Sequence, residues 1–186
     1  MSSVEKWKSL GSKPAGDYRI FKIRSDIKVS PRTGEAHDFY ILEAVNWVTV
    51  IALTTDNKLV MVEQYRHGSD TVELEAPGGM MDPEDTSPVE TAVRELREET
   101  GYEGTSAELI GQTFPNPAIM NNLCYTVLVR GCELKHKLHL DQTEDLATTL
   151  VEPEAVHDLI AKGRIGHSLV VVALYYYDQW RKKQSA

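Results

Sequence analysis

The chain has 186 residues, of which 41% are hydrophobic and 26% are charged, values that are ordinary for a globular domain long enough to bury a core. No stretch approaches the roughly 20 apolar residues of a membrane helix, and the first residues lack the apolar segment of a signal peptide. Two cysteines make no disulfide framework. These features predict a cytoplasmic protein that does not bind membranes.

The net charge of −8 is concentrated in one segment. Residues 82–103 contain eight acidic and two basic side chains, a net charge of −6. Such a concentration is costly unless cations compensate it. It also argues against nucleic-acid binding, because proteins of that class present a basic surface.

The first half of the chain predicts β-strands. Short alternating runs at residues 18–27 and 38–43, separated by a turn-rich stretch, predict a small amino-terminal sheet. Residues 47–53 and 59–64 predict a hairpin, and residues 71–75 predict a further strand.

The pattern becomes helical at Ser87. Ser87 can cap a helix, Pro88 suits its first position, and Gly101 can end it in the left-handed conformation. The apolar residues of this helix recur at helical spacing and are expected to pack against a sheet: Val89, Ala92, Val93 and Leu96.

The last part of the chain predicts one more strand and two helices. The strand covers residues 123–129, and the helices cover residues 152–162 and the apolar run that begins at Ser168. Strands that alternate with helices predict a mixed sheet between layers of helices.

Three glutamates of the central helix lie in a narrow arc beside its apolar face, at about 100° per residue: Glu95, Glu98 and Glu99. An acidic helix face is usually just solvated, and carboxylates this close repel one another without a counter-ion. Here, however, Gly78 and Gly79 lie just upstream and permit close backbone approach to a ligand. Because residues 82–103 contain only oxygen ligands and neither His nor Cys, Mg²⁺ is favoured over zinc.

These residues resemble the Nudix box, whose pattern is glycine, five residues, glutamate, seven residues, then Arg-Glu-apolar-x-Glu-Glu-x-Gly-apolar. Residues 94–102 match every fixed position, with Tyr102 at the last apolar place. In the first half, Asp85 stands where the pattern has glutamate, and the spacing from Asp85 to Arg94 is one residue longer. The resemblance implies an α/β protein, an α-β-α sandwich with a mixed sheet.

Residues outside the box resemble the ADP-ribose pyrophosphatase subfamily. The segments 63–66 and 72–79 resemble its approach to the box, and Pro117 its marker proline after the box. The strands before residue 46 resemble the arm through which such enzymes dimerise. We therefore expect a homodimerisation arm at residues 1–45 and a Nudix domain at residues 46–186.

The resemblance also implies site residues. The metal would be Mg²⁺, with Mn²⁺ as a substitute, held by the Gly78 carbonyl and the three glutamates Glu95, Glu98 and Glu99. Glu98 and Arg94 are expected to be catalytic, with Arg94 orienting Glu98. Glu144, in an acidic loop where Gln142 stands at a position that is often Glu, is the candidate general base, although a solvated loop acid is an equal alternative.

Three residues are expected to bind substrate: Arg66, Glu75 and Pro117. A guanidinium fits phosphate in bidentate fashion, although a surface ion pair is an equal alternative for Arg66.

The expected reaction is hydrolysis of the pyrophosphate bond of ADP-ribose or a related nucleoside-diphosphate sugar, which gives a nucleoside monophosphate and a sugar phosphate. Two alternatives stay open. One is hydrolysis of another nucleotide, such as capped RNA or a dinucleoside polyphosphate, and the other is a non-catalytic ligand sensor. The marker proline and the arm favour the first reading, and a basic RNA track is missing from the sequence.

Overall fold

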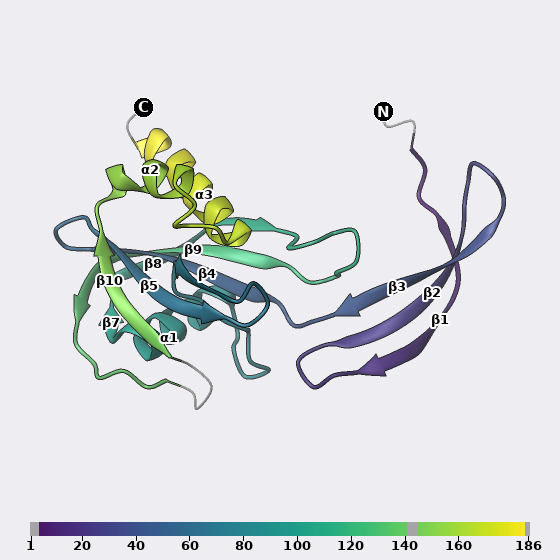
Figure 1. The fold of residues 1–186 in the computed structure, drawn as a ribbon, viewed down its shortest axis with the longest axis horizontal. Coiled ribbons are helices and arrows are strands. Elements are labelled where there is room, and N and C mark those ends of the chain that lie inside the picture. Colours follow the sequence, from purple (N-terminus) through teal and green to yellow (C-terminus); the bar gives the residue numbers. More distant parts are fainter. Residues whose placement is uncertain (1–3, 141–144, 185–186) are drawn as a thin grey trace. The chain divides into compact units, whose positions relative to one another are not determined.

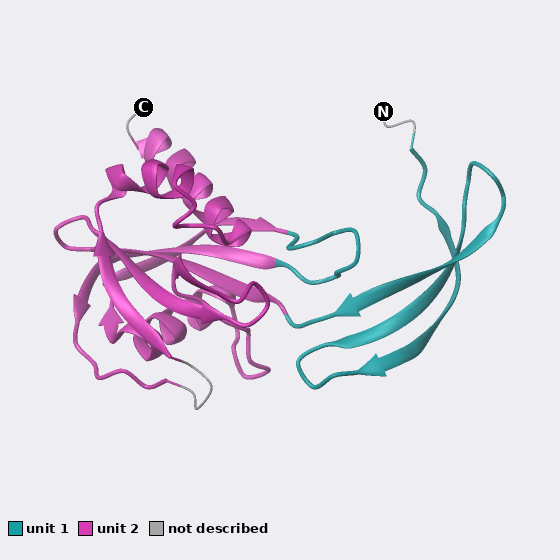
Figure 2. Cartoon of the chain, viewed as in Figure 1, with its two compact units in different colours: residues 1–45, 114–123 teal, residues 46–113, 124–186 magenta. Residues whose placement is uncertain are grey.

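The computed structural model describes residues 4–140 and 145–184. The chain divides into two compact units (Figure 2). One comprises residues 1–45 and 114–123, and the other comprises residues 46–113 and 124–186.

The smaller unit contains an antiparallel sheet of the three strands β1 (Lys8–Asp17), β2 (Lys22–Val29) and β3 (Ala36–Glu43), in that order (Figure 1). The sequence prediction missed β1, because its two glycines and Pro14 are unfavourable in a strand. They are tolerated here because β1 is an edge strand whose pairing with β2 has two register shifts. The strand predicted from residue 18 begins only at Lys22, since Arg19 has a left-handed backbone with φ 68°.

The segment 114–123 is attached to this smaller unit. The Leu42 amide donates to the Ile119 carbonyl at 2.7 Å, and the Asn122 side-chain amide donates to the Val45 carbonyl at 2.9 Å. Pro117 therefore belongs to the unit that contains the three-stranded sheet.

The larger unit is built on a mixed sheet. Among the described residues the sheet has seven strands, in the order β10-β5-β4-β9-β7, with β6 paired to β5 and β8 paired to β9. β4 and β9 are parallel, and the other pairs are antiparallel. The strands are β4 (Trp47–Thr54), β5 (Leu59–Arg66), β6 (Thr71–Glu75), β7 (Tyr102–Glu103), β8 (Ser106–Thr113), β9 (Cys124–Leu134) and β10 (Leu146–Val151). The expected mixed sheet is confirmed.

Two helices cover opposite faces of this sheet. In β4, Val50 and Ala52 pack with α1 (Pro88–Thr100), whereas Ile51 and Leu53 pack with α3 (Ser168–Gln184), because successive strand residues point to opposite faces. The 3-10 turn η1 (Pro153–Ala155) and the short α2 (Val156–Ala161) precede α3. No helix in the described ranges is both long and apolar enough to cross a membrane.

Helix α1 begins and ends as predicted. The Ser87 hydroxyl accepts from the Glu90 amide at 3.2 Å, and Gly101 closes the helix with φ 73°. Ala92 and Leu96 are buried, but the prediction for Val93 is wrong, since it is 37% exposed. Compared with the predicted apolar face, the buried side of α1 is turned toward the glutamates. Glu99, which is 4% exposed, lies on this buried side.

Candidate active site

A loop with two glycines carries the chain from β6 toward α1 and touches two of the predicted glutamates. The Gly78 amide donates to Glu99 Oε2 at 2.9 Å. A Cβ atom at Gly79 would lie 2.4 Å from Glu95 Oε1, and one at Gly78 would lie 2.2 Å from the Val48 carbonyl oxygen. Gly78 meets backbone atoms and therefore has no room for a side chain, whereas a side chain at Gly79 would displace the Glu95 carboxylate. The loop backbone thus lies against both carboxylates.

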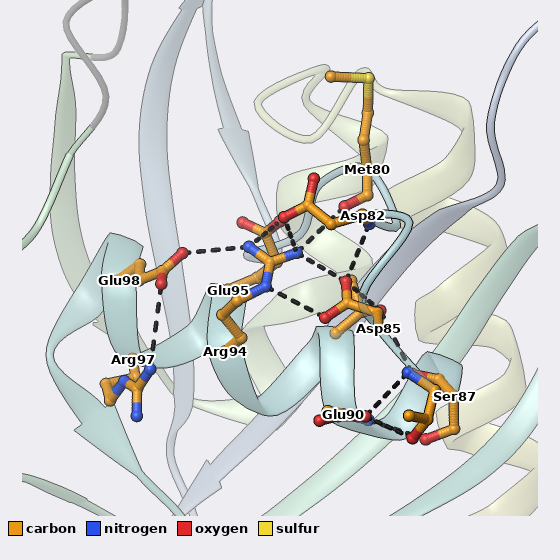
Figure 3. Close-up of polar contacts among 11 residues, drawn as sticks. Met80, Asp82, Asp85, Ser87, Glu90, Arg94, Glu95, Arg97 and Glu98 are labelled. Carbon is orange, nitrogen blue, oxygen red and sulfur yellow. Dashed lines mark hydrogen bonds and ion pairs between the residues drawn. The ribbon is translucent and has the colours of Figure 1, made fainter.

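Arg94 lies among carboxylates of α1 and of the loop that precedes it (Figure 3). Its Nη1 lies 3.0 Å from Glu95 Oε1 and 3.1 Å from Glu98 Oε2. Its Nη2 lies 2.9 Å from Asp85 Oδ2 and 3.3 Å from Asp82 Oδ2. Hydrogen bonding to Asp85 is the main reason that the pKa of Arg94 is raised. One cation is therefore shared by these four carboxylates, an arrangement that supports a role for Arg94 in orienting Glu98.

Asp85 is the loop acid that departs from the Nudix pattern. Besides Arg94, it accepts from the Thr91 hydroxyl and the Asp82 amide, both at 2.9 Å. The hydrogen bond from Arg94 is the largest of several effects that lower the pKa of Asp85 to about 2. The aspartate side chain of Asp85, although shorter than that of a glutamate, thus still reaches Arg94. It holds the guanidinium beside the other carboxylates of the cluster.

The side chains that α1 offers as metal ligands are of the kind that a hard cation prefers. Glu95, Glu98 and Glu99 offer only oxygen ligands, as Mg²⁺ prefers. The carbonyls of Pro77 and Gly79 accept from backbone amides, whereas no backbone amide in the described ranges donates to the Gly78 carbonyl between them.

The three glutamates are not gathered around a common point. Over residues 4–140 and 145–184, no three acidic, His or Cys side chains are arranged to hold a metal. Instead Arg94 lies against Glu95 and Glu98, so a cation bound to all three glutamates requires Glu98, which is 32% exposed, to turn from Arg94.

The glycine loop also lines a cavity of about 600 Å³. Its lining includes Gly78 and Gly79, the aromatic Trp47, and polar residues around Glu75, but none of the α1 glutamates. The loop therefore contacts the carboxylate cluster and also forms part of the cavity wall.

Glu75 organises the polar part of this cavity. Its carboxylate accepts from Arg66 Nε at 2.7 Å and Arg66 Nη2 at 2.9 Å, and it lies 2.7 Å from His167 Nδ1. Burial alone would raise the pKa of Glu75, but the hydrogen bonds from Arg66 and His167 lower it to about 2. Glu75, 1% exposed, thus holds the two side chains in place.

Arg66 and Glu75 were predicted from the sequence as site residues, whereas His167 was not. In the sequence, His167 stands directly before Ser168, where α3 begins. Pro117 lies in the other compact unit. Glu144 lies outside the described residues.

Comparisons with known proteins identify the family. The NUDIX domain family matches residues 45–173. The chain is 31% identical over 159 residues to the methanol dehydrogenase activator of Bacillus methanolicus, with 85% of each chain covered. It is 27% identical over 144 residues to the ADP-ribose pyrophosphatase of Bacillus subtilis (strain 168), with 77% of each covered.

A crystal structure of an ADP compounds hydrolase has the same fold, with a TM-score of 0.85, 21% identity, and 99% of this chain and 98% of that one covered. The match to the family covers most of the chain, including the whole of the Arg94 carboxylate cluster, and the chain therefore belongs to the Nudix family.

Proposed function

We propose that this Nudix pyrophosphatase hydrolyses the pyrophosphate bond of ADP-ribose or a related nucleoside-diphosphate sugar, giving a nucleoside monophosphate and a sugar phosphate. One observation carries the proposal: the glycine loop contacts Glu95 and Glu99 and also lines the cavity of about 600 Å³. A diphosphate beside the glutamates can then place a terminal group in the cavity, whose volume suits a small-molecule ligand.

The cofactor in this proposal is Mg²⁺, with Mn²⁺ as a possible substitute. The Gly78 carbonyl and the carboxylates of Glu95, Glu98 and Glu99 would hold it. When bound, Mg²⁺ supplies positive charge to phosphate oxygens and lowers the pKa of a water ligand. Arg94, whose Nη1 lies 3.1 Å from Glu98 Oε2, would orient Glu98.

The names of relatives support the substrate class. Besides the Bacillus subtilis protein, an ADP-sugar pyrophosphatase of Mus musculus is 31% identical over 117 residues, covering 62% of this chain and 50% of that one. Both names refer to a nucleoside diphosphate joined to a sugar, and we extend that substrate class to this chain.

A substrate screen tests the proposal. Purified protein is incubated with Mg²⁺ and ADP-ribose, ADP-glucose, a dinucleoside polyphosphate or capped RNA, and the phosphate released by an added phosphatase is measured. We expect the two nucleoside-diphosphate sugars to be hydrolysed fastest and the activity to disappear in a chelator. Turnover of the capped RNA or dinucleoside polyphosphate alone would contradict the proposal.

We also propose a homodimer formed through residues 1–45. Large apolar side chains of this segment are exposed by more than half in the chain alone: Leu10, Tyr18, Ile20 and Tyr40. A small three-stranded sheet gains stability by burying such a surface. Light scattering at micromolar concentration is expected to give twice the mass of the chain, and a monomer would refute this arrangement.

A further inference from the structure

Thr91 lies three positions before Arg94 on α1 and contacts the same loop acid. The Thr91 hydroxyl donates to Asp85 Oδ2 at 2.9 Å, and Arg94 Nη2 donates to the same oxygen at 2.9 Å. Residues three positions apart on a helix lie on one side of it, so a single carboxylate can accept from both. The Nudix pattern fixes no residue at the position of Thr91, and this contact is therefore a feature of the chain rather than of the pattern.

The Thr91 hydroxyl is available to Asp85 because the helix backbone does not need it. A threonine inside a helix often donates to the carbonyl four residues earlier, and here the Ser87 carbonyl lies 3.3 Å from the Thr91 hydroxyl. That carbonyl already accepts from the Thr91 amide at 3.2 Å. The hydroxyl has one proton, and its shorter contact, with a charged carboxylate, is the stronger of the two. The proton is therefore directed to Asp85.

Burial gives this hydrogen bond its effect on the position of Asp85. Thr91 is fully buried, and the Asp85 side chain is 8% exposed. Water has little access to replace a donor that is lost there, and a buried group without its partner is costly. The Asp82 amide also donates to Asp85 Oδ2, but it belongs to the loop itself. Thr91 and Arg94 are the donors that tie the loop acid to the helix.

Arg94 divides its donors between two sets of carboxylates. Its Nε and Nη2 face Asp85, at 3.4 Å and 2.9 Å, whereas its Nη1 faces Glu95 and Glu98. A cation that binds these two glutamates competes with Nη1 for their oxygens. The more firmly Asp85 holds Nε and Nη2, the less the guanidinium can turn toward the glutamates.

We propose that Thr91 is a positioning residue that acts through Asp85: it keeps Arg94 on the loop side of the cluster and so favours the release of Glu98 to a divalent cation. The inference rests on the metal site of the proposed function and adds a residue that tunes its affinity. Without the Thr91 hydroxyl, Asp85 is held less firmly, and Arg94 competes more strongly for Glu98. The affinity for the cation then falls although every carboxylate is still present.

Binding of Mn²⁺ to the full chain, followed by electron paramagnetic resonance without substrate, tests the proposal. Thr91→Val removes the hydroxyl and nearly keeps the volume of the side chain. We expect its dissociation constant for Mn²⁺ to be about threefold to tenfold higher than that of the wild type, up to the lower end for residues that support a metal ligand. Thr91→Ser keeps the hydroxyl and should restore most of the affinity.

Thr100→Val is the matched control. Thr100 is buried on the same helix, but its hydroxyl donates to the Leu96 carbonyl rather than to an acid. Both valine variants should lose thermal stability, whereas only Thr91→Val should bind Mn²⁺ more weakly. In turnover assays, Thr91→Val should need more Mg²⁺ for its half-maximal rate and still reach nearly the wild-type kcat.

A double-mutant cycle shows whether Thr91 acts through Asp85. If it does, adding Thr91→Val to Asp85→Asn should change the Mn²⁺ affinity by less than about twofold. Wild-type affinity in Thr91→Val, no restoration by Thr91→Ser, an equal loss in Thr100→Val or additive losses in the cycle would overturn the inference.

The same measurements separate this inference from the proposed reaction. Protein that shows the expected Mn²⁺ affinities but hydrolyses no nucleoside-diphosphate sugar would support the role of Thr91 and refute the reaction. Wild-type protein that hydrolyses these compounds without binding Mn²⁺ or Mg²⁺ would overturn the inference and leave the reaction standing.

Discussion

Two groups of acidic side chains flank the same glycine loop and differ in their balance of charge. In the first group, Arg94 of α1 is shared by four carboxylates, those of Asp82 and Asp85 in the loop before the helix and of Glu95 and Glu98 on the helix. In the cavity wall, which also contains Glu73, the carboxylate of Glu75 is contacted by two bases, Arg66 and His167.

The difference indicates which group needs a cation. The side chain of Glu75 is 2% exposed and fully engaged, so a metal would only displace partners that already compensate its burial. The side chain of Glu98 is 32% exposed. It lies in a group whose four carboxylates exceed the two nearby cations, Arg94 and Arg97, by two negative charges, which a divalent cation would relieve. The number of acids alone is thus a weaker indicator of a metal site than the ratio of acids to local bases.

The largest expected effect concerns the group with excess charge. Glu98→Gln should lower kcat by more than about 100-fold, the upper end for residues that merely support a metal ligand, because the amide is a weaker ligand for a hard cation. The thermal midpoint of the metal-free protein should not fall, since like-charge repulsion decreases. Turnover and thermal unfolding are measured with the metal removed and restored.

Two further variants control this prediction. Glu99→Gln should lose as much activity but also some stability, because the charge of Glu99 strengthens its hydrogen bond from the Gly78 amide. Glu90→Gln lies on the same helix, where Glu90 bonds to Thr86, and should keep full turnover. Full activity of Glu98→Gln, or of the wild type in chelator, would falsify the metal assignment.

Every carboxylate around Arg94 either contacts this guanidinium or is assigned to the metal. The general base is therefore expected to come from another part of the chain. Glu144→Gln should therefore lower kcat by about 100-fold, the lower end for general acid–base catalysis. Glu154→Gln is the matched control, because Glu154 lies in η1 and contacts Arg181 at 3.4 Å. Near-normal turnover of Glu144→Gln at several pH values would remove the assignment.

The sequence predicted the α1 cluster better than the cavity wall for a physical reason. Residues 94–99 are joined by local helical geometry, so the spacing of Arg94 and Glu98 alone implied their ion pair. His167 meets Glu75 across 92 positions of the chain, and no periodicity encodes such a contact. The edge strand β1 was missed likewise, because pairing with β2 overrides the poor strand propensity of its glycines and proline.

The ion pairs around Glu75 are expected to make the free energy of unfolding depend on pH. The pKa of Glu75 in the folded protein is about 2, below its ordinary value of 4.5. Its contribution, about 3 kcal/mol by linkage, is therefore fully present above pH 4.5 and is lost as the pH falls toward 2. Glu75→Gln should unfold at lower urea concentration at pH 7, and the difference from the wild type should shrink between pH 4.5 and 2. A difference that is constant across this range would contradict the ionic role of Glu75.

A smaller loss of activity is expected when the acid that holds Arg94 in place is changed. Asp85 fixes Arg94, as Glu75 fixes Arg66, but it does so in the group with excess charge, where other carboxylates can partly replace it. Asp85→Asn should therefore lower kcat only about tenfold, as for the mildest losses of residues that support a metal ligand, with KM nearly unchanged. Asp85→Glu should keep most activity, because glutamate retains the charge that faces Arg94.

Asp82→Asn provides the comparison for Asp85. Asp82 also pairs with Arg94, at 3.3 Å, but its side chain is 56% exposed, whereas that of Asp85 is 8% exposed, and exposed pairs contribute little. Asp82→Asn should thus leave kcat within about twofold of the wild type, since an exposed pair is worth well under 1 kcal/mol. Steady-state kinetics of the three variants would decide the question. Equal losses in Asp82→Asn and Asp85→Asn would show that Arg94 responds to total charge rather than to the buried hydrogen bonds of Asp85.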